Sequence, residues 1–178
     1  MAATDEMAAI ALKHKPHAAC IVPEKREERT TEGGIDAALQ QIRLMPLVRE
    51  LGRAGIRVSL FIEPDKKQIA AAKALGAPVV ELHTGAYCEA AFAGDETART
   101  RHLKALQEGA REARRLGLEV HAGHGLTYDT VGAIAAMPEI EELNIGHFII
   151  GEAIFSGLDS AIRRMRAAMD EARAKAIA

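Results

Sequence analysis

The sequence predicts an α/β fold built around a parallel β-sheet. Short apolar runs that are typical of buried strands alternate with longer periodic patterns that are typical of helices, in the order of one helix followed by five strand–helix units. Alternation of this kind favours parallel strands joined by right-handed crossovers. The chain has 178 residues, which suits a single domain spanning residues 1–178.

The individual elements follow from local signals along the chain. Thr4 is a suitable N-cap for the first helix, Pro23 ends the first strand, and Gly76 lies where a helix C′ residue is expected. Pro46 is expected to bend or interrupt the second helix. The expected strands are 17–22, 56–62, 78–83, 118–122 and 141–145. The expected helices are 4–14, 36–53, 65–75, 97–116, 128–136, a short one beginning near 148, and 158–176, with a glycine-containing loop before 97–116.

The strand pattern favours a barrel over an open doubly wound sheet. Neither a GxGxxG nor a GxxxxGK[ST] motif follows the first strands, which argues against a nucleotide-binding doubly wound sheet. A (β/α)8 barrel needs its full set of strands to close, yet five are expected here and the first helix has no strand before it. We therefore expect an incomplete TIM barrel, truncated at its N-terminal side and comprising strands four to eight.

The composition argues against several classes of partner. Lysine and arginine total 23 against 25 aspartates and glutamates, so the formal net charge is −2, and aromatic residues make up 3% of the chain. This balance disfavours binding to nucleic acid or to an anionic membrane. The N-terminus lacks signal-peptide features, and no apolar run approaches about 20 residues. Cys20 and Cys88, to which we assign no role, fit free thiols in a reducing cytoplasm.

Ionisable side chains gather at the expected C-terminal ends of the strands, where barrel enzymes carry their active sites. In the third strand, Glu81 and His83 alternate with Val80 and Leu82. Glu81 therefore points into the barrel if the two apolar residues face the helices. A carboxylate there is costly unless it is paired, hydrogen-bonded or protonated, so Glu81 is either catalytic or part of a structural ion pair.

The glycine-rich ends of the last two strands suggest sites for a proton donor and for phosphate. His124 lies between Gly123 and Gly125 and can exchange a proton near neutral pH, although an incidental histidine in a turn is the alternative. His121 is expected to face elsewhere and to serve in packing. Gly146 precedes the start of a helix, an arrangement that binds phosphate through free N–H groups, although a plain turn is the alternative.

Several motifs together resemble the pyridoxine 5′-phosphate synthase family. The resemblance extends from Met1 to about Arg173, and the order and spacing of the motifs agree with the family. The motifs are VPEKREERTTEGG (22–34), VSLFIEP (58–64), ELHTGAY (81–87), HAGHGLTYDTV (121–131) and ELNIGH (142–147). Within the first, the charged residues 24–29 are typical of a solvated loop, and on the catalytic face they could also cover the site.

The resemblance implies a (β/α)8 barrel that condenses 1-deoxy-D-xylulose 5-phosphate with 3-amino-2-oxopropyl phosphate to give pyridoxine 5′-phosphate, phosphate and water. It implies no organic cofactor and no metal, and typically a homo-octamer. On the matching motifs, His124 would be the proton donor and Glu81 the transition-state stabiliser. Gly125, Gly146 and His147 would bind the 3-amino-2-oxopropyl phosphate.

The chain also departs from the family pattern. Thr30, the first threonine of TTEGG, would contact the deoxyxylulose phosphate, but the family's Asn-x-Asp-His motif at strand one and its His and Arg cluster after strand two are absent. The family's third-strand catalytic glutamate precedes a Met-Ala pair to which Met1 and Ala2 correspond. We therefore expect the general bases to lie upstream and this chain alone to be inactive. His121 stands where many relatives are expected to carry asparagine.

Two other functions remain as alternatives. One is a metal-dependent TIM-barrel hydrolase that holds zinc with His83, His124 and His147, which is weakened because no ligand pair shares a strand face at the active end. The other is a non-catalytic phosphate-binding fragment.

Overall fold

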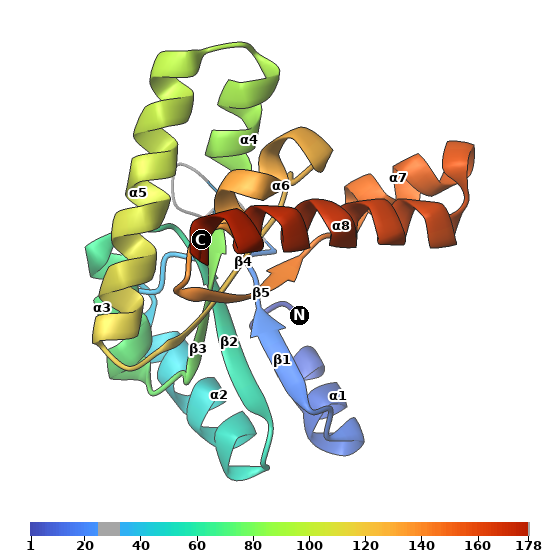
Figure 1. Ribbon diagram of the computed structural model, residues 1–178. Helices are drawn as coiled ribbons and strands as arrows, with labels where there is room; N and C mark the ends of the chain where they lie inside the picture. The colour runs from blue at the N-terminus through green and yellow to red at the C-terminus, as the bar shows by residue number, and fades with distance from the viewer. Residues whose placement is uncertain (25–32, 178) are drawn as a thin grey trace.

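The computed structural model describes residues 1–24 and 33–177, and at its centre lies a sheet of five strands (Figure 1). The strands pair in chain order, β1-β2-β3-β4-β5, and every pairing is parallel. Their bounds are β1 Ala18–Ile21, β2 Arg57–Ile62, β3 Val79–His83, β4 Glu119–Gly123 and β5 Ile140–Asn144. The predicted α/β fold class is confirmed, and the strand order is that of an incomplete (β/α)8 barrel.

The helices alternate with these strands as predicted, with one addition. Their bounds are α1 Asp5–His14, α2 Gln41–Arg53, α3 Lys66–Leu75, α4 Gly85–Phe92, α5 Glu96–Arg115, α6 Tyr128–Ala135, α7 His147–Ser156 and α8 Leu158–Ile177. The expected loop before α5 is wrong, because residues 85–92 form α4. Gly85 begins this helix rather than breaking it, the alanines that follow favour helix, and the left-handed Gly94 (φ 71°) comes after its end.

Side chains at the helix ends account for the element boundaries. Thr4 Oγ1 accepts a hydrogen bond from the Met7 amide at 3.2 Å at the start of α1. Asp65 caps α3, and Gly76 ends it in the left-handed conformation with φ of 84°, as predicted. Helix α2 begins later than expected and continues through Pro46 without interruption. Pro46 is the sixth residue of α2, beyond the first turn, so it removes one hydrogen bond inside the helix without ending it.

The apolar core lies between the sheet and the helices rather than inside the barrel. Helices α2, α3 and α5 lie together along one side of the sheet (Figure 1) and contact one another and strands β2 to β4. The residues of β2, β3 and β4 in this buried cluster are the alternate ones: Val58, Leu60, Ile62, Val80, Leu82, Val120 and Ala122. The intervening residues face the other way, and many of them are polar, whereas TIM-barrel interiors are dominated by Val, Ile and Leu.

A charge network occupies this polar inner face. Glu119 Oε1 lies 2.7 Å from Arg57 Nη1 and 2.7 Å from His121 Nε2, and His121 Nδ1 lies 3.4 Å from Glu142. The hydrogen bond from His121, together with the Arg57 charge, lowers the pKa of Glu119. The packing role predicted for His121 therefore needs correction. It is buried, but it pairs in register with Glu81 on the inner face and holds two carboxylates.

Helices α7 and α8 extend together away from the sheet (Figure 1). Helix α7 has no buried residue, and the pair exposes the apolar side chains Ile150, Ile154, Phe155, Leu158 and Ile162. Within the described residues, no helix combines the length and apolar character needed to span a membrane.

Candidate active site

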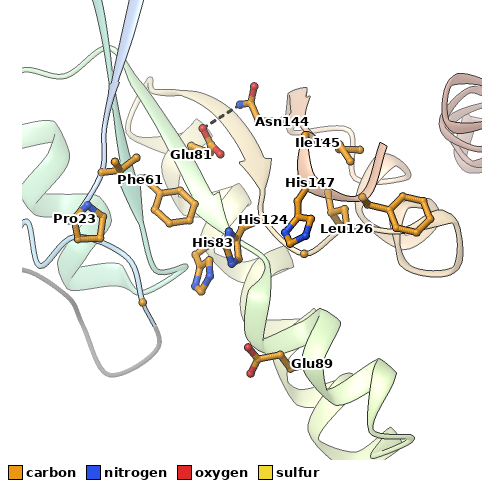
Figure 2. Close-up of a pocket in the computed structure, with 15 residues that line it drawn as sticks. Pro23, Phe61, Glu81, His83, Glu89, His124, Leu126, Asn144, Ile145 and His147 are labelled. Carbon is orange, nitrogen blue, oxygen red and sulfur yellow. Dashed lines mark hydrogen bonds between the residues drawn. The ribbon is translucent and has the colours of Figure 1, made fainter. Parts of the chain in front are cut away.

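A cavity of about 780 Å³ opens at the C-terminal ends of the strands (Figure 2). Phe61 comes from β2, Glu81 and His83 from β3, and Asn144 from β5, so the parallel strands deliver their last inner-face side chains to one place. The turns after β4 and β5 complete the wall. This is the position at which (β/α) barrels perform chemistry.

Five of the six residues singled out in the sequence line this cavity: Glu81, His124, Gly125, Gly146 and His147. They come from three separate segments of the chain, and the parallel strand order brings them together. Thr30, and with it most of the charged segment 24–29, lies outside the described residues.

Glu81 is buried and held in place by two donors. Its Oε2 accepts hydrogen bonds from Asn144 Nδ2 at 3.0 Å and from Cys20 Sγ at 3.5 Å. Burial raises the pKa of Glu81, although both hydrogen bonds oppose the shift. Burial and the neighbouring carboxylate raise the pKa of Cys20 to about 12, so its thiol remains a donor. Val80 and Leu82 pack in the core, which gives Glu81 the inward orientation predicted from strand alternation.

His124 occupies a strained backbone position at the mouth of the cavity. Its φ is +81°, a left-handed conformation that is uncommon for residues other than glycine and is concentrated at functional sites. The Thr84 hydroxyl donates to the carbonyl oxygens of His124 at 2.5 Å and Gly123 at 2.8 Å and so fixes this turn. Gly125, also left-handed with φ of 80°, continues it.

The start of α7 presents an anion-binding geometry to the same cavity. Gly146 is the N-cap residue, makes no side-chain capping bond, and would have no atom within 4 Å of an added Cβ. The first N–H groups of a helix lack partners within the helix, and the helix dipole adds positive potential there. Together, the open N-terminus and the nearby His147 form a suitable site for a phosphate group.

Comparison with known proteins identifies the family. Residues 1–171 match the family described as "Pyridoxal phosphate biosynthesis protein PdxJ". The chain belongs to this family. A pyridoxine 5′-phosphate synthase from Rhodospirillum rubrum is 67% identical over 172 residues, which cover 97% of this chain and 68% of the relative. A pyridoxine 5′-phosphate synthase from Ruegeria pomeroyi is 63% identical over 174 residues, which cover 98% of this chain and 70% of the relative.

Two solved structures share the fold with this PdxJ-family chain at low identity. An HpcH/Hpal aldolase/citrate lyase family protein from Burkholderia cenocepacia has a TM-score of 0.55 at 15% identity, and the match covers 96% of this chain and 74% of that one. A xylose isomerase domain protein from Planctomyces limnophilus has a TM-score of 0.54 at 15% identity, with coverages of 90% and 65%. At such identity the likeness supports the fold alone.

In and behind the wall of its cavity, this PdxJ-family chain also carries residues to which the sequence alone gave no role in the synthase reaction. Asn144 orients Glu81, and Phe61 packs edge-on against His83 with ring centroids 5.0 Å apart. The His83 ring lies beside the His124 ring. Its Nδ1 is hydrogen-bonded to Glu63 Oε1 at 2.9 Å. His83 and Asn144 end their strands, Phe61 is the second-last residue of β2, and Glu63 directly follows β2. The rule that barrel chemistry lies at strand ends was therefore the available signal.

The zinc alternative requires three converging ligands. Among residues 1–24 and 33–177, no group of three His, Cys, Asp or Glu side chains is arranged to hold a metal ion. His83 directs Nδ1 to Glu63 instead of sharing an open coordination position with His124 and His147. The described part of the chain therefore offers no ligand set for that hydrolase.

Replacing Glu81 by glutamine is expected to raise the free energy of unfolding at neutral pH. Because burial raises the pKa of the folded-state carboxyl group, its favourable contribution is fully present below the unfolded pKa and is lost as pH rises through the folded pKa. The glutamine side chain keeps an oxygen that accepts the hydrogen bond from Asn144, but it carries no charge that burial would destabilise. Single stabilising substitutions commonly add about 0.5–2 kcal/mol to the free energy of unfolding. Urea unfolding of both proteins across the acidic to neutral range measures the difference. The difference should shrink on acidification, and a gap that widens would contradict the pKa assignment.

Proposed function

We propose that this chain carries the pyridoxine 5′-phosphate synthase active-site face that acts on 1-deoxy-D-xylulose 5-phosphate and 3-amino-2-oxopropyl phosphate. The products are pyridoxine 5′-phosphate, inorganic phosphate and water. One observation carries the proposal: residues that the family motifs single out on β3, after β4 and after β5 all line one cavity. The names of the curated relatives support the same activity.

His124 is the proposed proton donor of the reaction. Amine addition to a ketone, dehydration and phosphate loss each require a proton on the departing or developing oxygen, and a positioned histidine supplies it efficiently. The left-handed turn places the His124 ring at the cavity, beside Gly125. Glu81 is the proposed transition-state stabiliser, which is supported by its buried carboxyl group lining the cavity with Oε2 fixed by Asn144.

The proposed binding site for the phosphate of 3-amino-2-oxopropyl phosphate comprises Gly125, Gly146 and His147. The open N-terminus of α7 supports it, because backbone N–H groups and the helix dipole favour an anion there. Thr30 is proposed to contact the deoxyxylulose phosphate, on the family motif alone. We propose that the reaction needs no organic cofactor and no metal.

Substituting Gly146 by alanine is expected to weaken binding of inorganic phosphate about two- to fivefold, which corresponds to ~0.3–1 kcal/mol of lost interaction with the helix terminus. The added methyl group meets no protein atom within 4 Å, so it occupies space next to the anion without disturbing the fold. Calorimetric titration with inorganic phosphate measures the dissociation constant. Gly151→Ala is the matched control, because it lies further along α7 and also has open space. Equal affinity in Gly146→Ala and the parent would place the phosphate elsewhere.

We also propose that the full-length protein forms a homo-octamer in the cytoplasm. The family resemblance supports the octamer, and the apolar side chains exposed on α7 and α8 provide surface for subunit contacts. Both cysteines are free, as expected in a reducing compartment. Light scattering of the purified protein tests the assembly.

The activity itself is tested by supplying both phosphorylated substrates. We compare the 178-residue chain with a fusion that carries, ahead of Met1, whatever segment of the Rhodospirillum rubrum relative precedes its aligned residues. The fusion is expected to form pyridoxine 5′-phosphate and to release phosphate in equal amounts, and the chain alone to stay at background. A fusion that binds phosphate but forms no product would favour the non-catalytic phosphate-binding alternative.

A further inference from the structure

We propose that His83, oriented by the buried carboxylate of Glu63, is a second proton-transfer residue of this site and acts as a general base opposite His124. The inference rests on the proposed function for its substrate and on the geometry of three residues for its chemistry. None of the roles proposed above for the synthase reaction uses His83 or Glu63.

Glu63 holds His83 from behind the cavity wall. The Glu63 side chain is 11% exposed and the His83 side chain 7% exposed, and Glu63 Oε1 lies 2.9 Å from His83 Nδ1. The same oxygen accepts a hydrogen bond from the Gly34 amide at 2.8 Å. Because an amide N–H can only donate, Oε1 acts as an acceptor, and an ionised carboxylate accepts the Nδ1 proton as well. The pair therefore matches the carboxylate–imidazole arrangement that orients a catalytic histidine.

This contact fixes which ring nitrogen is basic. When Nδ1 carries the proton, Nε2 of the neutral ring has a free lone pair. A Cβ at position 85 would lie 2.5 Å from His83 Nε2, so Gly85 keeps the space beside this nitrogen open. His83 lines the cavity, as Figure 2 shows, whereas Glu63 does not.

The two histidines are placed for complementary proton transfers. Their ring centroids are 5.0 Å apart, and both face the cavity (Figure 2). Thr84, which follows His83 in the chain, donates to the His124 carbonyl, so the two side chains share one rigid corner. As the substrate amine adds to the ketone, a C–N bond forms and an N–H bond breaks, with that proton passing to His83 Nε2. The carbonyl electron pair moves to oxygen, which takes a proton from His124.

A buried ion pair with a purely structural role would show the same distances, so the test must separate the two. Selective ¹⁵N labelling of histidine in the 178-residue chain reports which His83 nitrogen is protonated, with His83→Gln used for assignment. We expect protonated Nδ1 and bare Nε2 in the neutral ring, and in Glu63→Gln a shift of the proton toward Nε2. A bare Nδ1 in the parent overturns the proposal. This readout does not depend on the substrates, so it stands even if the fusion makes no pyridoxine 5′-phosphate.

Turnover is measured in the active fusion. His83→Ala is expected to lower kcat by about 10²–10⁴-fold with KM changed little, and added imidazole is expected to restore part of the loss. Glu63→Gln, which keeps the volume and removes the charge, should lower kcat with the fold intact. His102→Ala removes a histidine from helix α5, outside the cavity, and serves as the control. A kcat within threefold of the parent, or a loss that imidazole leaves unchanged, assigns His83 to packing and overturns the proposal.

Discussion

Replacing His124 by alanine is expected to lower kcat of the active fusion by about 10²–10⁴-fold, the range typical for a lost proton-transfer group. The ring is the proposed donor, and its backbone is fixed by the Thr84 hydroxyl, so the substitution removes the acid and leaves the turn in place. Steady-state turnover with both phosphorylated substrates measures the effect. Substrate affinity should change less than kcat, because the proposed phosphate contacts lie at Gly146 and His147 rather than at His124.

The left-handed backbone of His124 supplies an internal control. His124→Gly removes the same ring but relieves the strain of a φ of +81°, so it should be more stable than His124→Ala by about 1 kcal/mol. Both variants should nevertheless lose turnover equally. Activity that follows stability rather than the presence of the ring, or a fully active His124→Ala, would refute the acid assignment.

Gly123→Ala is expected to destabilise the protein by about 1–3 kcal/mol and to lower turnover with it. A Cβ at this position would lie 2.6 Å from Glu81 Oε1 and 2.7 Å from the Asn144 carbonyl oxygen. The second contact is with the backbone of the neighbouring strand, so relief requires β4 and β5 to separate or Glu81 to leave its position. Urea unfolding and turnover of the fusion measure the two effects.

Alanine substitution of a glycine that has open space around it is expected to have the opposite effect on stability. Gly52 lies in the last turn of α2 with no atom within 4 Å of an added Cβ, so Gly52→Ala should stabilise the protein by about 0.4–1 kcal/mol, chiefly by restricting the unfolded chain. If Gly123→Ala behaved like Gly52→Ala, the tight packing around Glu81 would be contradicted.

Strand periodicity predicted the fold well because it reports directly on burial. Val80 and Leu82 enter the core, and Glu81 faces inward, as alternation requires. Local rules also placed the Gly76 helix end. They failed at α4, where Gly85 starts a short helix, because a glycine's local preference does not reveal that its missing side chain makes room for His83.

The site was less predictable, since its contacts join residues distant in the chain. Glu63 and His83 are 20 positions apart, and Cys20 and Glu81 are 61 apart. Only the pairing of β1, β2 and β3 brings them together, and no local pattern encodes that distance. The roles proposed for His124 and Glu81 came from motif resemblance, whereas the strand-end rule pointed only to the region.

The polar inner face of the sheet has a consequence for mutational tolerance. In barrels filled with aliphatic side chains, both faces of each strand demand apolar residues. Here only the helix-facing positions need apolar residues, because charged side chains such as Arg57 and Glu142 occupy the opposite face. When every position of β2 is substituted in turn, tolerance to polar residues should therefore alternate along the strand. Positions 58, 60 and 62 should accept aliphatic residues alone, whereas 57 and 59 should accept many polar ones.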